Sequence, residues 1–135
     1  MLSEKKLSPE QSFDISDAMQ AAAASAMMLR RELKDSLSAQ EFQMLVERET
    51  ALRYDADRYR AVGIKLLANN GALTARGLIG AIDQATRSIG SVGDIQRVLN
   101  ILNRLVALSA AIIAGTVQGI LVQVAELKAT IKANA

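Results

Sequence analysis

The sequence contains no cysteine and no histidine, and it contains a single proline. The absence of cysteine excludes disulfide bonds. The absence of histidine removes the commonest metal ligand and the commonest general base of enzymes. Pro9 lies near the start of the chain, so no proline interrupts a helix after it. These absences favour an α-helical protein with no metal and no cofactor.

Aromatic residues are also scarce, at 3% of the chain, whereas hydrophobic residues make up 50%. The 16 Lys and Arg side chains are spread along the sequence, and the formal net charge is only +2. Binding to nucleic acid needs clustered basic residues, and single strands also need aromatic rings on which bases stack. The composition therefore argues against nucleic acid as a partner, and no pattern indicates a small-molecule substrate.

Without histidine or cysteine, an active site would have to use carboxylates, Lys, Arg or Tyr. The two candidates are Glu49, which falls on an apolar helix seam, and Tyr59 with a neighbouring arginine. A lone glutamate on a seam is more typical of a residue that fixes helix register. The sequences GLIG and GSVG follow no strand and carry no P-loop lysine, which excludes a phosphate-binding loop. We expect no enzymatic activity and no catalytic residues.

Apolar periodicity and helix-capping residues predict an all-α fold, with residues 1–135 forming a single elongated domain of four helices. A polar N-terminal arm is expected over 1–13, with Asp14 or Ser16 capping the first helix. Ser38 and Glu41 form a capping box at the start of the second helix. The expected helices lie near 16–35, 39–69, 73–89 and 94–132.

The second expected helix has an apolar seam at the heptad spacing of a coiled coil. Its members are Phe42, Leu45, Glu49, Leu52, Ala56, Tyr59, Gly63 and Leu66. The opposite side is charged, and three pairs along the helix have salt-bridge spacing, namely Glu49–Arg53, Asp55–Arg58 and Asp57–Arg60. This helix is expected to stop at Asn70-Gly71, which would form a left-handed cap, and to lie antiparallel to part of a central last helix.

Two shorter features indicate where the chain could bind or bend. In the first helix, Met19, Ala22, Ala26, Leu29 and Leu33 form one stripe, and methionine adapts to varied partner surfaces. A partner-binding role of this Met/Ala face, as in a small adaptor or chaperone, is one functional alternative. The third helix region is rich in glycine, and we expect hinges at Gly77, Gly80, Gly90 and Gly93.

The last expected helix, 94–132, would be about 57 Å long at 1.5 Å per residue. It contains 21 consecutive uncharged residues, Leu105–Ala125, between Arg104 and Glu126. On one continuous helix, small residues would form a shallow groove beside a line of polar residues at heptad spacing. We expect a helix-packing or oligomer interface formed by Ala107, Ala111, Gly115, Gly119, Ser109, Thr116 and Gln123.

The uncharged stretch is long enough to span a bilayer, and its small residues suit helix pairing in membranes. Gln118, Gln123 and the two glycines disfavour insertion, and no Trp or Tyr belt flanks it. We therefore predict a non-catalytic structural or assembly protein that self-associates as a homo-oligomer, such as a subunit of a particle, filament, ring or tube. The alternative is a membrane-active protein, pore-forming, holin-like or translocator, that inserts 105–125 into lipid. The N-terminus lacks a signal-peptide pattern, so synthesis in the cytoplasm without Sec export is expected.

Overall fold

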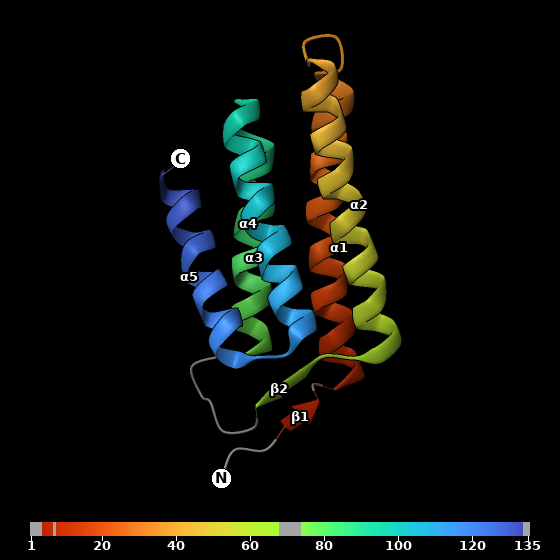
Figure 1. The fold of residues 1–135 in the computed structure, drawn as a ribbon, viewed down its shortest axis with the longest axis vertical. Coiled ribbons are helices and arrows are strands. Elements are labelled where there is room, and N and C mark those ends of the chain that lie inside the picture. Colours follow the sequence, from red (N-terminus) through yellow and green to blue (C-terminus); the bar gives the residue numbers. More distant parts are fainter. Residues whose placement is uncertain (1–3, 7, 68–73, 134–135) are drawn as a thin grey trace.

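The computed structural model describes residues 4–6, 8–67 and 74–133, and within these ranges the chain forms five helices and two short strands (Figure 1). The all-α prediction is confirmed, but the predicted number of four helices is wrong. In chain order the elements are β1 (Glu4–Lys6), α1 (Pro9–Glu32), α2 (Ala39–Val62), β2 (Lys65–Leu67), α3 (Ala75–Val92), α4 (Ile95–Ala114) and α5 (Val117–Ala133).

Successive helices run in alternating directions along one bundle axis (Figure 1). α1 packs against α2 and α3, α4 packs against α2 and α3, and α5 lies against α4 and α3. Hydrogen bonds from Gln96 to Glu41 and from Arg48 to Asn103 show that α2 and α4 run parallel. The expected antiparallel packing of the second helix on the last one is therefore wrong, because α1 takes the antiparallel place beside α2.

α1 begins at Pro9, several residues before the expected start. Ser8 accepts a hydrogen bond from the Gln11 N–H at 3.2 Å, and the Gln11 side chain accepts one from the Ser8 N–H at 3.1 Å. This capping box, followed by proline at the first helical position, is a strong start signal. The expected arm over 1–13 is thus too long, and Asp14 and Ser16 lie inside the helix instead of capping it.

The Met/Ala stripe of α1 packs inside the chain. Met19, Ala22 and Ala26 have no exposed surface, because α1 is covered by both α2 and α3. Alanines allow close approach between helices, which suits a helix at the centre of three. The expected role of this stripe as a partner-binding face is therefore wrong.

α2 confirms most of the predicted seam and its capping box. The Ser38 hydroxyl accepts from the Glu41 N–H at 3.0 Å, and Leu45, Glu49, Leu52, Ala56 and Tyr59 are buried. The helix ends at Val62, earlier than expected, because Gly63 adopts a φ of 74°. Lys65–Leu67 then pairs antiparallel with Glu4–Lys6. The expected stop at Asn70-Gly71 lies outside the described residues.

The expected helix 94–132 is two helices. Gly115 adopts a left-handed conformation with a φ of 73°, and its N–H bonds the Ala111 and Ile112 carbonyls. The chain then turns at Thr116 and α5 returns along α4. The longest helices of the bundle, α1 and α2, have 24 residues each, which is about 36 Å. The prediction of a single 57 Å helix is therefore wrong. Gly115 ends α4, and because the chain then reverses, α4 and α5 can both bury their apolar sides in the bundle.

The glycines proposed as hinges lie in or next to α3. Gly77, Gly80 and Gly90 are inside the helix, and Gly93 caps it with a φ of 73°. The helix itself runs from Ala75 to Val92, with Thr74 as its N-cap, so the expected bounds 73–89 are shifted by two to three residues. Three of the four glycines therefore sit in regular helix, and hinge motion at these positions stays a prediction.

Candidate functional site

The outward side of the α4–α5 hairpin carries no charge between Arg104 and Glu126. Buried leucines and isoleucines on the opposite sides of both helices pack into the bundle. Apart from Thr116 beside the turn, the exposed residues between Arg104 and Glu126 are three alanines, one valine and one glutamine. We call this surface the neutral face, and it comprises the exposed Ala110, Ala114, Gln118, Val122 and Ala125 with the half-buried Ala107.

Val122 is the largest apolar side chain of the neutral face, and 43% of its surface is exposed. The surrounding alanines are too small to shield it. A folded protein gains free energy when such carbon surface leaves water, at about 25 cal/mol per Å2. The neutral face is therefore chemically suited to cover by another apolar surface.

An ion pair joins the two helices at the edge of the neutral face. Arg104 Nη1 lies 2.7 Å from Glu126 Oε2, and the side chains are 45% and 47% exposed. These are the residues that bound the uncharged stretch in the sequence, and the antiparallel hairpin brings them to the same height. The pair is too exposed to contribute much to folding.

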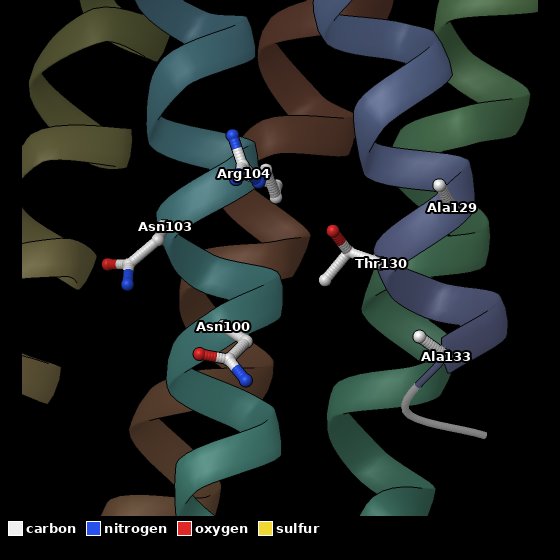
Figure 2. A pocket seen from close by; sticks show the side chains of 6 residues that line it. All are labelled: Asn100, Asn103, Arg104, Ala129, Thr130 and Ala133. Atoms are coloured by element: carbon white, nitrogen blue, oxygen red, sulfur yellow. The ribbon is translucent and has the colours of Figure 1, made fainter.

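Beyond the ion pair, the surface between α4 and α5 forms a hollow of about 340 Å3. Asn100, Asn103 and Arg104 line it from α4, and Ala129, Thr130 and Ala133 line it from α5 (Figure 2). Figure 2 shows that Asn103 is directed away from α5, where its Oδ1 accepts a hydrogen bond from Arg48 Nε at 2.6 Å. Amide and small side chains thus line the hollow toward the end of α5, together with the charged side chain of Arg104.

A buried polar cluster joins α2 to α4 and was not predicted as a site. The Ser109 hydroxyl donates to Asp55 Oδ2 at 2.6 Å and lies 2.7 Å from the Tyr59 hydroxyl. The Tyr59 hydroxyl also donates to the Ser109 carbonyl at 3.0 Å. Burial raises the pKa of Tyr59 above its ordinary value, the Ser109 hydrogen bond lowers it and the Asp55 charge raises it. In the sequence, Tyr59 lies on the apolar seam of the second expected helix and Ser109 lies in the polar line of the last one, and neither pattern indicates that the two side chains meet.

Glu49, the other residue considered for catalysis, is engaged in helix packing. Its carboxylate accepts hydrogen bonds from Arg30 Nε at 2.7 Å and Nη2 at 3.1 Å, and it is 3% exposed. The Arg30 guanidinium also lies 5.1 Å from the centre of the Phe42 ring. This paired contact fixes the register of α1 on α2, as the seam position of Glu49 indicates.

The residues predicted as an oligomer interface do not lie on one helix face. Ala107 and Ala111 are half-buried on α4, Gly119 and Gln123 are half-buried on α5, and Gly115 forms the turn. Thr116 is exposed beside that turn, and Ser109 is completely buried in the polar cluster. Ala107 alone of these belongs to the neutral face. The predicted continuous groove is wrong because the chain reverses at Gly115.

Gln123 faces inward, and its Oε1 is buried without a hydrogen-bond partner among the described residues. Within the same residues, no group of three or more acidic side chains is arranged to hold a metal ion.

Among the described helices, α4 has the length and composition to cross a membrane, with a mean hydropathy of 1.5, and 44% of that stretch is buried. The core helix of a soluble protein meets the same criteria.

Comparison with protein-family models, with curated proteins and with solved structures finds no match to this chain.

Proposed function

We propose that this protein is a non-catalytic structural subunit that self-associates through the neutral face, as part of a particle, filament, ring or tube. The observation that carries the proposal is the uncharged outward side of the α4–α5 hairpin, with Val122 exposed among alanines. The centres of protein interfaces are depleted of charged residues, and contiguous exposed apolar surface marks interaction sites.

The contacts of the two residues considered for catalysis also support a structural role. Glu49 is held by Arg30 between α1 and α2, and Tyr59 is held by Ser109 between α2 and α4. Ser109 has no exposed surface, and its hydroxyl is engaged by both Asp55 and Tyr59. All three side chains are explained by helix packing.

Sedimentation velocity over a range of protein concentrations, without detergent, tests this proposal. We expect the wild type to sediment as a homo-oligomer, and Val122→Glu to shift it toward monomer because a buried carboxylate would lack a partner. Val62→Glu is the matched control, because Val62 is 57% exposed at the end of α2, away from the neutral face. A wild type that stays monomeric throughout would overturn the proposal.

Membrane activity is the second candidate, favoured by the length and composition of α4. Because the stretch 105–125 is folded as two arms, it would enter lipid as a helical hairpin with Gly115 at its apex. Each arm has about ten residues, or about 15 Å, which is half of a typical 30 Å hydrocarbon core. Flotation with liposomes and release of a trapped dye test this candidate, and protein that neither floats nor releases dye at any pH would exclude it.

A further inference from the structure

The charges that border the neutral face have opposite signs on its two helices. Arg104 on α4 is positive and Glu126 on α5 is negative, and both side chains are nearly half exposed. Their contact engages Nη1 of Arg104, whereas a guanidinium has five N–H donors in all. The pair therefore presents a positive and a negative group side by side to whatever covers the face.

We propose that a second copy of the chain covers the neutral face about a two-fold axis parallel to the helices, so that α4 of each copy lies on α5 of the other. In this arrangement, equivalent residues of the two copies lie at the same height along the bundle axis. Arg104 of one copy then meets Glu126 of the second copy, and the reverse contact forms by symmetry. The four charges alternate in sign around a square. This inference rests on the proposed self-association.

Charge complementarity selects this axis over the other way of stacking two faces. A two-fold axis perpendicular to the helices places α4 on α4. Centred on the ion pair, it sets Arg104 against Arg104 and Glu126 against Glu126, which costs free energy. If the perpendicular axis instead passes through the centre of the neutral face, the ion pair of one copy lies at the far end of the second copy's hairpin, away from the second ion pair. Of these arrangements, the parallel axis alone covers both neutral faces and also pairs both charges.

The parallel axis also gives each helix antiparallel neighbours. α4 and α5 are antiparallel within one chain, as the contact between Arg104 and Glu126 and the turn at Gly115 require. Placing α4 on α5 of the second copy repeats the same relation between chains. Helix dipoles are then opposed at every contact. The perpendicular axis also opposes the dipoles of facing helices, so the charges of Arg104 and Glu126 are what select the parallel axis.

Mixing two charge-reversed variants tests whether the pair acts between copies. Arg104→Glu alone and Glu126→Arg alone each set like charges against each other, within a chain and between copies. We expect each to raise the dissociation constant about tenfold or more. In an equimolar mixture, both carboxylates of the first variant meet the two guanidinium groups of the second, so we expect hetero-association close to wild-type strength. Circular dichroism of each variant alone checks that it is folded.

Cysteine cross-linking tests the same geometry in chains with unaltered charges, because the protein has no cysteine of its own. Ala107 and Val122 lie at similar heights on α4 and α5, on either side of the hairpin. With the parallel axis, a mixture of Ala107→Cys and Val122→Cys chains forms the mixed disulfide under mild oxidation, since such bonds need Cβ atoms about 4 Å apart. Predominant Ala107→Cys homodimers would instead indicate the perpendicular axis.

The outcomes separate this inference from the proposed function. If the wild type is an oligomer but neither the charge mixture nor the mixed disulfide forms, the axis is wrong and self-association stands. If the wild type stays monomeric and floats with liposomes, both proposals fail and lipid covers the neutral face.

Discussion

This bundle contains two antiparallel helical hairpins, α1–α2 and α4–α5. The two hairpins differ in the side chains that join their helices. In α1–α2, polar contacts cross between the helices. Glu49 pairs with Arg30, the Ser16 hydroxyl donates to the Ala56 carbonyl at 2.8 Å, and Arg60 pairs with Asp17. In α4–α5, the exposed ion pair Arg104–Glu126 crosses at the edge of an uncharged surface.

The difference indicates that the two hairpins have different tasks. The polar contacts of α1–α2 lock its register, and its charged outer side suits solvent. The α4–α5 hairpin buries its large side chains inward and leaves alanine and valine outward. Changes in α1–α2 should therefore alter folding stability, whereas changes on the neutral face should alter association.

The largest effect on folding is expected for Glu49→Ala. Removing the carboxylate leaves Arg30, whose side chain is only 19% exposed, without its charge partner. We expect the free energy of unfolding to fall by about 3 kcal/mol in urea titrations. Glu47→Ala is the control, because the Glu47 side chain is 54% exposed. Similar small losses for both variants would contradict the register role of Glu49.

A smaller effect is expected at the α4–α5 turn. Gly115 has a φ of 73°, a conformation that costs other residues about 1–2 kcal/mol, so Gly115→Ala should destabilise by that amount. Gly80→Ala is the informative contrast, because a Cβ at Gly80 would meet no atom within 4 Å. It should stabilise α3 by about 0.5–1 kcal/mol, as measured by thermal unfolding. Equal changes in both variants would refute the assignment of the turn.

The buried polar cluster predicts sensitivity to alkaline pH. Since burial raises the pKa of Tyr59, the folded state holds this proton more tightly than the unfolded state. The stabilisation is complete below the unfolded pKa of about 10 and is lost as the pH rises above it. We expect Tyr59→Phe to reduce the loss of stability above pH 10. In a Tyr54→Phe chain, the absorbance of tyrosinate reports Tyr59 alone, and titration at its ordinary pKa would contradict the burial.

The smallest effect on folding is expected for Val122→Glu, although it should change association most. Val122 is 43% exposed, so the folded monomer can keep the new carboxylate in water. Surface substitutions of this kind change the free energy of unfolding by about 0.5 kcal/mol or less. Unfolding measured at a concentration where the protein is monomeric checks this value. A loss of several kcal/mol would mean that the neutral face is part of the monomer's own core.

Local signals predicted the helical class and the seam of α2. The capping box of Ser38 and Glu41 also forms as expected. The start of α1 was not predicted, although Ser8 and Gln11 form the same kind of capping box and Pro9 directly follows Ser8. These features depend on neighbours within a few residues, which is why the sequence reveals them.

Features that depend on the tertiary fold were not predictable in the same way. The turn at Gly115 looks like a helical position in the sequence, because apolar residues continue on both sides of it. Its hairpin gains stability from the rest of the bundle, which local patterns do not encode. Likewise, Glu49 was expected to pair with Arg53 within α2, but its partner is Arg30 on α1. The neutral face can be recognised only when the α4–α5 hairpin is known, because the hairpin brings its residues onto one surface.

The most direct measurement of the central claim is the rate at which a thiol reagent labels Val122→Cys as the protein concentration rises. Because the wild-type chain has no cysteine, the label reports this position alone. We predict that labelling of Val122→Cys slows as copies associate, whereas labelling of Val62→Cys stays constant. Labelling of Val122→Cys that is independent of concentration would contradict the claim that a second copy covers the neutral face.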